Sequence, residues 1–512
     1  MNVLSAVACF YACFFCVLSS FGGHAAPTTI NFNFAGMIPS PSCGPGPSCP
    51  EPDPLSAFAQ SLSPQARVLF PPSQVYQQIL SQFETTALHG REFPALIVRA
   101  AEEEDVVKAV NFARENGLTF AVKGGAHGYE GIAVPPFGLL LDLSLMKHIE
   151  FDSSTNHLRF QAGIICGDLD AFTETYNRAA VCGNCYTVGS GFLAHGGYGA
   201  LSRRHGLAID NIVSIDLVTY EGAVVTASDT ENQDLFWAVR GALPNFGVAV
   251  SFVVRTHDVS TFYGGAAAFL GDSFTQVAQW VRDRQGDLDF HTRLTVVHAP
   301  VPGGRLVSAE VALWGEDRTE QEKADFFASF LSIPGLLSHN VGNATYFDNQ
   351  AANAPLIDAA LPLHTGFPIA GSNELGTDEF FETFYEHFLN IPNSLVPSAV
   401  NLWGGAIADV PRNATAFWGR GMVWDWFMTA MYVDPVTDVA ALKSITDAAA
   451  AALHAVEGAT ADVYTNWLSK AEEGVAERVY GENLQRLREL KREWDPNNFF
   501  SHNFNVLPME SW

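Results

Sequence analysis

Three glycine-rich segments constrain this chain more strongly than any other feature of its sequence. The first reads Lys-Gly-Gly-Ala-His-Gly at residues 123–128 and directly follows a strand-like run. Successive small residues let backbone N–H groups converge on a pyrophosphate without side chains in the way. One such turn is weak evidence, but residues 184–199 and 240–247 are further glycine-rich segments in the same part of the chain. Together the three predict a cradle for a phosphate-bearing ligand.

Common signatures of nucleotide and metal sites are absent from the sequence. No Gly-x-Gly-x-x-Gly opens a helix after a strand, no Gly-x4-Gly-Lys-Ser/Thr loop is present, and no His-Glu-x-x-His offers a metal site. Cys182-Gly-Asn-Cys185 has the spacing of a thiol–disulfide centre, but it lacks the strand–helix–strand context of such centres. We therefore predict no metal ion and a phosphate cradle of another type.

The balance of charge excludes two classes of partner. Lys and Arg number 28 against 55 Asp and Glu, which gives a formal net charge of −27. Nucleic acids and anionic membranes need a basic footprint, so we expect neither as a partner. The chain has 512 residues, 48% of them hydrophobic. It is therefore long and apolar enough for two or three domains with buried cores, and general disorder is excluded.

Hydrophobic periodicity predicts an α+β fold for the first part of the chain. Residues 102–116 have the apolar spacing of an amphipathic helix that ends at Gly117. Further helices are predicted at residues 169–180, 232–240 and 484–494. Strand-like runs lie at residues 95–98, 119–122, 139–143, 158–162, 212–219 and 248–254. From residue 258 to 461, alternating runs between acidic helices predict a second domain with an antiparallel sheet.

The N-terminus has the pattern of a signal peptide. Residues 3–18 are apolar and uncharged, and small residues precede a predicted cleavage after Ala25. The apolar run is shorter than the ~20 residues that a membrane span needs. We therefore expect residues 1–25 to be removed, the protein to be secreted and no part of it to be a membrane anchor.

Cysteines and glycosylation sequons are compatible with an oxidising compartment. Residues 26–68 form a Pro/Gly-rich segment in which Cys43 and Cys49 are predicted to close a disulfide. Asn343-Ala-Thr and Asn413-Ala-Thr are candidate glycosylation sites. Cys166, Cys182 and Cys185 remain in the mature chain, an odd number that requires a separate role for one of them.

The glycine-rich segments, together with Asp-Pro-Asn-Asn-Phe-Phe at residues 495–500, resemble the berberine bridge enzyme-like oxidases of the vanillyl-alcohol oxidase flavoprotein superfamily. The resemblance spans about residues 94–255 and resumes at about 464–508. It implies an α+β fold with a two-part FAD-binding domain and a substrate domain whose antiparallel sheet is covered by helices. The implied boundaries are 69–257 and 464–512 for the FAD-binding domain and 258–463 for the substrate domain.

The resemblance also implies how FAD is held. The family's Arg-Ser-Gly-Gly-His loop carries a histidine bonded to the flavin 8α-methyl group, and His127 stands at that position. Many members bind flavin C6 through the cysteine of Cys-Pro-Thr-Val-Gly, which is similar to Cys185-Tyr-Thr-Val-Gly189. FAD is therefore expected to be bound covalently through His127 and Cys185, which leaves Cys166 and Cys182 either to pair or to stay as buried thiols. The other implied cofactor contacts are Lys123, Gly124, Gly125, Ala126, Gly128, Thr187, Val188, Gly189, Gly196, Gly197, Tyr198, Gly199 and Asn466.

Two departures from the family pattern concern catalysis. The family's Gly-Gly-Gly-Tyr-Gly segment begins here with His195, and Tyr-x-Asn-Tyr, whose second tyrosine serves as catalytic base, reads Tyr464-Thr-Asn-Trp467. An indole cannot accept a proton. Tyr464 is one candidate base, although in a strand it would point away from the face of Trp467. His195, with an ordinary pKa of about 6.5, is the second candidate. A third is an acid of the substrate domain such as Asp425, which no motif supports.

The resemblance implies an oxidase that passes a hydride from an alcohol or an activated C–H bond to flavin, with O2 as second substrate and peroxide as product. Val188 matches the position that in relatives controls oxygen access, and valine there leaves the path open. We expect a small molecule of specialised metabolism as substrate. An oligosaccharide is the alternative, stacked on Trp403, Trp424, Trp426 and Trp467. A flavin-carrying, allergen-like binding protein with little turnover is the alternative of another class.

Overall fold

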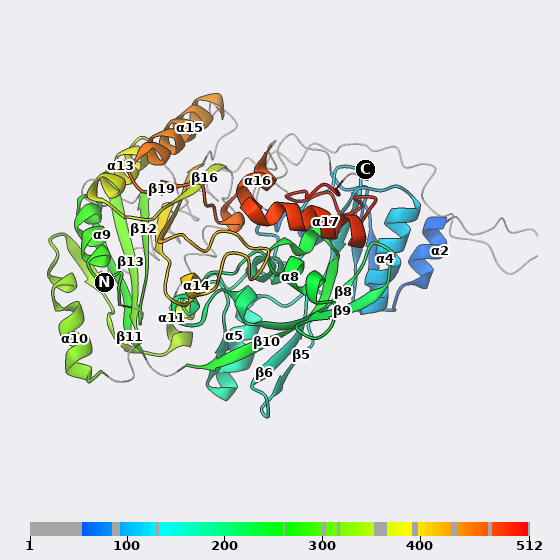
Figure 1. Ribbon diagram of the computed structural model, residues 1–512, viewed down its shortest axis with the longest axis horizontal. Coiled ribbons are helices and arrows are strands. Elements are labelled where there is room, and N and C mark those ends of the chain that lie inside the picture. Colours follow the sequence, from blue (N-terminus) through cyan, green and yellow to red (C-terminus); the bar gives the residue numbers. More distant parts are fainter. Residues whose placement is uncertain are drawn as a thin grey trace, which may run out of the picture.

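The computed structural model describes residues 54–83, 93–128, 133–259, 262–287, 289–298, 301, 304–314, 318–352, 366–391, 398–431, 439–468 and 474–509. The predicted signal peptide and the predicted Cys43–Cys49 pair lie outside the described residues. Within this part of the chain the strands form sheets of four, six and nine strands. In Figure 1 the nine-stranded sheet occupies the left of the molecule and the other two sheets the right. The predicted α+β class with an antiparallel second sheet is confirmed.

The four-stranded sheet has the order β1-β2-β4-β3. Its strands are β1 (Arg67–Leu69), β2 (Leu96–Arg99), β3 (Phe120–Lys123) and β4 (Leu139–Asp142). β4 pairs in parallel with both β2 and β3, and all four of its residues are buried. Its apolar run Leu-Leu-Leu suits this place, because the central strand of a parallel sheet is covered on both faces.

The six-stranded sheet is antiparallel and has the order β5-β6-β10-β8-β9, with β7 beside β10. Its strands are β5 (Ile149–Asp152), β6 (His157–Gln161), β7 (Arg178–Ala180), β8 (Ile212–Val218), β9 (Val224–Ser228) and β10 (Val248–Asp258). The helix predicted over residues 169–180 is therefore wrong in its second half. The helix ends at Thr173, and after the left-handed Asn177 (φ 52°) the chain turns into β7. An αL residue ends a helix, and Asn adopts this conformation more readily than most residues.

Short helices pack against these two sheets. They are α2 (Pro54–Ser61), α3 (Gln74–Leu80), α4 (Glu103–Glu115), α5 (Cys166–Thr173), α6 (Ser190–Ala194), α7 (Ser202–His205) and α8 (Gln233–Ala242). The predicted amphipathic helix is α4, and it buries Val106, Ala109, Val110 and Ala113. Asp105 caps it by accepting the backbone N–H groups of Ala101 and Glu102. No helix among the described residues is both long and apolar enough to cross a membrane.

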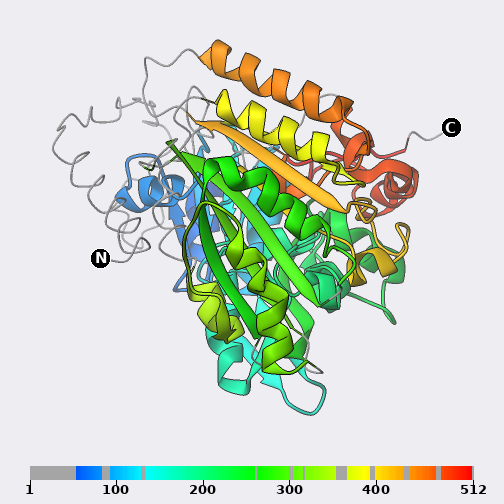
Figure 2. The same ribbon diagram turned by 90° about the vertical axis from the view of Figure 1, so that its left-hand side faces the viewer.

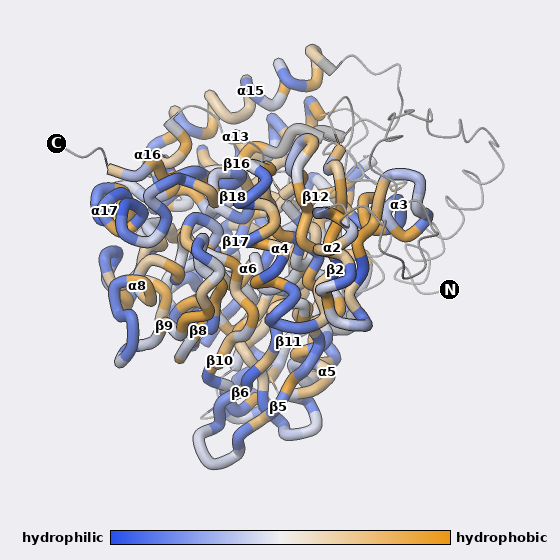
Figure 3. The backbone as a smooth tube through the Cα atoms, turned by 90° about the vertical axis from the view of Figure 1, so that its right-hand side faces the viewer, coloured by the Kyte–Doolittle hydropathy of each residue, from blue (hydrophilic) through white to orange (hydrophobic). Residues whose placement is uncertain are grey.

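The C-terminal segment returns to the first two sheets. It contains α16 (Val475–Tyr480) and α17 (Leu484–Trp494), which lie beside α8 in Figure 1. Figure 3 shows α17 as largely hydrophilic, while the central strands are mostly hydrophobic. The buried Lys491 ammonium pairs with Asp495 at 2.6 Å and also donates to the carbonyls of Asn245 and Phe500. These bonds fasten the chain end to the segment before β10, so distant parts of the sequence build one domain.

The nine-stranded sheet has the order β14-β11-β13-β12-β17-β18-β16-β19, with β15 beside β11. Its strands are β11 (Phe262–Leu270), β12 (Phe290–His298), β13 (Arg305–Leu313), β14 (Leu336–His339), β15 (Gly342–Ala344), β16 (Gly366–Asn373), β17 (Ser398–Leu402), β18 (Trp424–Met431) and β19 (Ala459–Thr460). The helices of this domain are α9 (Phe274–Arg282), α10 (Glu320–Ala328), α11 (Tyr346–Ala352), α13 (Asp378–Leu389), α14 (Ala406–Asp409) and α15 (Val439–Ala455). Figure 2 shows helices of this group lying across the outer face of the sheet.

The alternation of β18 separates its two faces. Trp424, Trp426 and Met428 belong to the core beneath the helices, whereas Phe427 packs in a separate small cluster with Trp467. Because neighbouring residues of a strand point to opposite faces, Asp425 shares the face of Phe427. This inner face is turned toward the C-terminal segment of the first domain, since Trp467 stacks on Phe427 and donates to Asp425.

Candidate active site between the two domains

The first two glycine-rich segments pack directly against each other. A Cβ atom built on Gly125 would lie 2.4 Å from the backbone nitrogen of Gly189 and 2.7 Å from the carbonyl oxygen of Thr187. A Cβ on Gly189 would in turn lie 2.4 Å from the nitrogen of Gly125. No side chain fits at either position without moving backbone, so glycine is required at both. The sequence therefore brings the loop after β3 into backbone contact with the loop before α6.

This contact brings the two predicted covalent tethers together. His127 Nε2 lies 2.8 Å from Thr187 Oγ1, and Cys185 Sγ lies 3.2 Å from the same oxygen. Cys185 is half-buried and carries a free thiol. The Thr187 hydroxyl group is therefore close to both the His127 imidazole and the Cys185 thiol, although these two residues are 58 positions apart in the sequence (185 − 127). The thiol and the imidazole are the nucleophiles that a doubly attached flavin requires.

Lys123, which was predicted to contact the cofactor, lies beneath the first loop. Its ammonium group pairs with Asp142 at 3.2 Å, and both side chains are buried. The two residues are register partners in the parallel pair of β3 and β4. Burial lowers the pKa of Lys123, while the Asp142 carboxylate opposes that shift. The ion pair fixes the strand end from which the loop departs, and direct contact of Lys123 with a cofactor stays a prediction.

Residues 195–199, at the end of the second glycine-rich segment, form what we call the third loop, which is separate from the segment at residues 240–247. Gly196 and Gly197 have φ values of +116° and +76°, which other residues rarely adopt. A Cβ on Gly199 would lie 1.8 Å from the carbonyl oxygen of Cys182, so this segment touches the residues just before Cys185. The backbone N–H of Tyr198 donates to the Tyr464 hydroxyl at 2.9 Å. The C-terminal motif and the third loop are therefore in direct contact.

Residues 464–467 do not form the strand that we expected. Thr465–Trp467 is a turn of 3₁₀ helix, and its N-cap is Tyr464. In a 3₁₀ helix residues three apart lie one above the other, so Tyr464 and Trp467 are on the same side. Their rings meet edge to face with centroids 5.4 Å apart. Asn466 holds this turn to the third loop, because its amide donates to the Tyr464 hydroxyl at 2.9 Å and to the carbonyl of His195 at 3.3 Å.

A buried carboxylate lies beside Trp467 and accepts its indole N–H. Asp425 accepts a hydrogen bond from Trp467 Nε1 and another from the Asn401 side chain, and its exposed fraction is 0%. Asn401 and Asp425 are register partners on β17 and β18, and Arg293 is the partner of Asn401 on β12. The three form a polar row on the inner face of the sheet. No motif reveals this row, because strand pairing and not local sequence assembles it.

The three candidate bases differ in their ionisation. Burial raises the pKa of Asp425 to about 6, although hydrogen bonds from Asn401 and Trp467 oppose the shift. Burial raises the pKa of Tyr464 above its usual value of about 10, so its anion is scarce near neutral pH. Burial lowers the pKa of His195, which is therefore neutral. The Gly191 carbonyl lies 2.8 Å from His195 Nδ1 and can only accept, so the proton is on Nδ1 and Nε2 is basic.

The tryptophans expected to stack on sugars lie mostly elsewhere. Trp403, Trp424 and Trp426 each have an exposed fraction of 0%. Trp424 and Trp426 face the helices, and Trp403 is stacked on Tyr198 with centroids 4.8 Å apart. Trp467 is half-buried and stacks on Phe427 at 4.4 Å. These positions match the general tendency of strand aromatics to form core.

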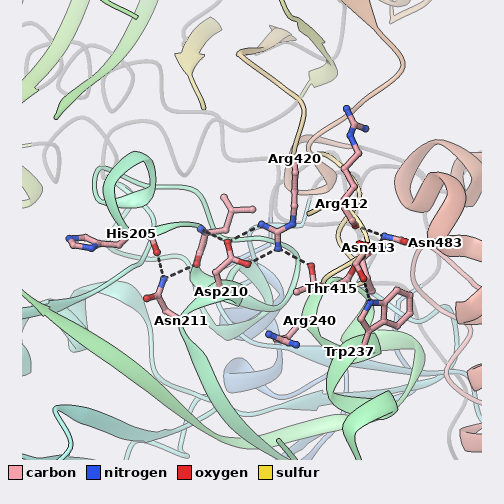
Figure 4. Close-up of polar contacts among 12 residues, drawn as sticks. His205, Asp210, Asn211, Trp237, Arg240, Arg412, Asn413, Thr415, Arg420 and Asn483 are labelled. Carbon is pink, nitrogen blue, oxygen red and sulfur yellow. Dashed lines mark hydrogen bonds and ion pairs between the residues drawn. The ribbon is translucent and has the colours of Figure 1, made fainter. Parts of the chain in front are cut away.

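Both candidate glycosylation sites are on the surface. The Asn343 side chain is exposed on β15, and Asn413 is exposed in the connection between α14 and β18. Figure 4 shows Asn413 within a network that joins the two domains: its carbonyl accepts from Trp237 Nε1, and nearby Arg420 pairs with Asp210. Arg420 also donates to the hydroxyl of Thr415, the third residue of the sequon, at 2.9 Å.

The arrangement fits FAD on its chemistry. The glycines at the loop contact let two backbone segments approach each other with no side chain between them, and closely placed backbone segments of this kind form the anion-binding concavities that a pyrophosphate requires. His127 and Cys185 would hold the isoalloxazine, and the third loop and Asn466 lie beside them. Among the described residues, no group of three or more His, Cys, Asp or Glu side chains is placed to hold a metal ion.

Comparison with known proteins agrees with this site. Residues 94–228 match the family model described as "FAD binding domain", and residues 463–506 match "Berberine and berberine like". The FAD-linked oxidoreductase pgmH of Aspergillus terreus is 31% identical over 445 residues, covering 81% of this chain and 88% of pgmH. The (R)-6-hydroxynicotine oxidase of Paenarthrobacter nicotinovorans is 29% identical over 467 residues, covering 88% and 99%.

Solved structures share the same fold. The 6-hydroxy-D-nicotine oxidase of Arthrobacter nicotinovorans superimposes with a TM-score of 0.77 at 25% identity, covering 88% of this chain and 100% of that one. A glucooligosaccharide oxidase of Acremonium strictum, whose FAD is described as 6-S-cysteinyl and 8α-N1-histidyl, has a TM-score of 0.75 at 20% identity, covering 87% and 98%. The chain belongs to the berberine bridge enzyme-like family of FAD-linked oxidoreductases. The resemblance expected from the sequence is confirmed.

Proposed function

We propose that this protein is a secreted oxidase with doubly attached FAD that oxidises an alcohol or an activated C–H bond of a small aromatic molecule. The observation that carries the proposal is the convergence of His127 Nε2 and Cys185 Sγ on the Thr187 hydroxyl. When bound, FAD supplies the hydride acceptor and the means of passing electrons to O2. The remaining roles belong to the chain.

The loops hold and orient the cofactor in this proposal. The backbone of residues 124–128 and 187–189 would cradle the pyrophosphate, and His127 and Cys185 would hold the isoalloxazine ring in place. Val188, with an exposed fraction of 7%, lies between the tether cysteine and the helix α6. Its small size leaves the oxygen path beside the ring open, which makes the protein an oxidase.

We assign the proton-accepting role to Asp425. It is bonded to Trp467, the residue at the position of the family's catalytic tyrosine, and its pKa of about 6 leaves it ionised at neutral pH. Each carboxylate oxygen has a second lone pair with which to accept the substrate proton. Tyr464 is disfavoured because its raised pKa makes it a poor base, and its hydroxyl already accepts from Tyr198 and Asn466. Neutral His195 is the second candidate.

The substrate class follows from what the inner face offers. Trp467, which is half-buried, provides one aromatic surface backed by Phe427. Its indole nitrogen donates to Asp425, which is buried together with Asn401 in the polar row that Arg293 extends. This surface suits one planar ring with a polar substituent. An oligosaccharide needs several stacking platforms, and three of the four predicted tryptophans are buried in the core. A xylooligosaccharide oxidase of Thermothelomyces thermophilus is nevertheless 40% identical over 167 residues, so sugars stay in the test panel.

Secretion rests on two supporting observations. The N-terminal apolar run is typical of a signal peptide, and Cys166 and Cys182 form a disulfide, which persists in oxidising compartments. Expression of the full chain in a secreting host, followed by N-terminal sequencing of protein in the medium, tests it. Protein retained in the cell with an intact N-terminus contradicts the proposal.

The activity is tested by anaerobic flavin bleaching and by peroxide release across a panel of aromatic alcohols, phenols, cyclic amines and oligosaccharides. We expect an aromatic compound to bleach the flavin and air to restore it with one peroxide per turnover. Bleaching by sugars alone would favour the oligosaccharide alternative. No bleaching by any class would favour the binding protein with little turnover.

A further inference from the structure

The Cys182-Gly-Asn-Cys185 motif has a partner outside the motif. Cys182 is bonded to Cys166, with Cα atoms 5.9 Å apart, and the Cys185 thiol is left free. Both bonded cysteines have an exposed fraction of 1%, whereas Cys185 is half-buried. One cysteine of the motif, Cys182, therefore forms a structural disulfide, and the other, Cys185, keeps a free thiol in the site.

Cys166 lies at the start of α5, and this helix start runs along the loop that carries the tether. Ile165 and Gly189 form an antiparallel bridge. The N–H of Cys166 donates to the carbonyl of Val188 at 2.9 Å, and the N–H of Gly167 donates to the carbonyl of Tyr186 at 2.8 Å. The loop is therefore held by backbone bonds along its length, independently of the disulfide at its beginning.

The spacing of the motif creates a competing reaction. Two cysteines separated by two residues readily form their own disulfide, as in thiol–disulfide centres. Where Cys182 is not held by Cys166, oxidised glutathione can join the Cys182 and Cys185 thiols in a disulfide: the two thiols lose two electrons and two protons, and the oxidant is reduced to two glutathione molecules. That product contains no thiol at residue 185. A flavin thioether cannot then form.

We propose that Cys166 protects the flavin tether: by keeping Cys182 in a disulfide, it reserves the Cys185 thiol for flavin C6. The inference rests on the proposed function, which requires the thioether at Cys185. Cys166 is a positioning residue here, since it acts through Cys182 and touches neither the substrate nor the flavin.

Two variants separate protection from simple support of the loop. Cys166→Ser leaves Cys182 free to pair with Cys185, whereas Cys166→Ser/Cys182→Ser removes the disulfide and the competing thiol together. Each is folded with FAD in a buffer containing oxidised glutathione, the oxidant that is reduced to two glutathione molecules as a new disulfide forms. Peptides are then mapped by mass spectrometry without reduction.

We expect wild type and the double variant to carry the thioether at Cys185. In Cys166→Ser the fraction of protein that carries the thioether should fall at least about tenfold, which corresponds to about 1.4 kcal/mol in a competing equilibrium. This variant should also show a Cys182–Cys185 peptide and should keep the His127 bond. Equal thioether in wild type and Cys166→Ser would overturn the inference alone. Equal loss in both variants would also overturn it, because the disulfide would then only support the loop. Absence of the thioether from wild type would overturn this inference and the Cys185 part of the proposed function together.

Discussion

The two sides of the site are built in different ways. On the first domain, loops 123–128 and 184–199 carry their chemistry in contiguous residues, so that glycines, His127 and Cys185 can be read in order. On the second domain, Arg293, Asn401 and Asp425 come from three strands and meet through strand register alone. The first side holds a cofactor that many relatives share. We propose that the second side faces the substrate, and there Asp425 accepts from Trp467, the residue of the C-terminal segment at which this chain departs from the family pattern.

The largest expected effect tests the substrate side. Asp425→Asn should lower the rate of anaerobic flavin reduction about 10²–10⁴-fold, because it removes the group that accepts the substrate proton. Asparagine still accepts the hydrogen bond of Trp467 through its carbonyl oxygen, and its amide donates to Asn401 once the Asn401 side chain turns its own oxygen toward it, so the fold is kept. The measurement is stopped-flow absorbance of the flavin with the best panel substrate.

Tyr464→Phe and His195→Ala are the matched controls for this variant. Each should lower the reduction rate by less than about tenfold, the change that a residue in transition-state contact exceeds. If the reduction rate of either control falls more than about tenfold while Asp425→Asn keeps the wild-type rate, the catalytic base is Tyr464 or His195 and not Asp425.

The next prediction concerns pH. Burial raises the pKa of Asp425 to about 6, so its basic form predominates only above that value. The reduction rate of wild type should rise with pH and level off above about pH 6, with a fall of about tenfold per unit below it. Asp425→Asn should remove this rise, and His195→Ala should keep it. A profile that is flat in wild type would break the assignment.

A smaller effect tests the cofactor side. Val188→Ile adds a methylene group beside the tether loop, where a buried position leaves it little space. Reoxidation of the pre-reduced enzyme by air should slow several-fold, with the anaerobic reduction rate unchanged. Val188→Ala is the control and should reoxidise at least as fast as wild type. Slow reoxidation of wild type itself would contradict the oxidase assignment.

The smallest expected effect lies where the two sides join. Gln350 of α11 donates to Asp170 of α5 at 3.1 Å and to the carbonyl of Gly183 at 3.2 Å. Burial raises the pKa of Asp170 to about 7, so the contribution of the neutral acid to folding is fully present below its ordinary pKa of about 4 and is lost progressively as pH rises from there to about 7. Asp170→Asn, neutral at every pH, should therefore raise Tm by about 2–4 °C at pH 8 and by less at pH 5.

Thermal unfolding followed by circular dichroism at the two pH values checks this. Glu174→Gln removes a nearby charge that also raises the pKa of Asp170, and it should give a smaller gain at pH 8. Equal Tm changes at pH 5 and pH 8 would show that Asp170 acts by packing and not by its charge.

The sequence predicted the cofactor side because its chemistry is local. Glycines at 125 and 189 mark a close backbone contact, and the proposed tethers His127 and Cys185 lie near them in the sequence. The helix over α17 ends at Trp494, as the following Asp495-Pro496 predicted. The substrate side was not predictable in the same way. Asp425 lies between two core tryptophans, and only its pairing with Asn401 and its bond to Trp467 distinguish it from a structural acid.

Local conformation explains the remaining errors. Residues 464–467 contain β-formers, but the turn is set by tertiary bonds from Asn466 to the third loop, which sequence periodicity does not contain. Residues 174–180 have a helical pattern in the sequence, but the last three of them form β7, because they pair with β10. In both places a contact between distant parts of the chain decides the local structure.

The central claim is that FAD is attached at two residues of this chain. Peptide mapping by mass spectrometry of acid-precipitated, reduced wild-type protein tests it most directly. We expect a pellet that stays yellow and flavin on the peptides that contain His127 and Cys185, with single attachment in His127→Ala and in Cys185→Ser. FAD that is fully released into the supernatant, with both peptides unmodified, would contradict it.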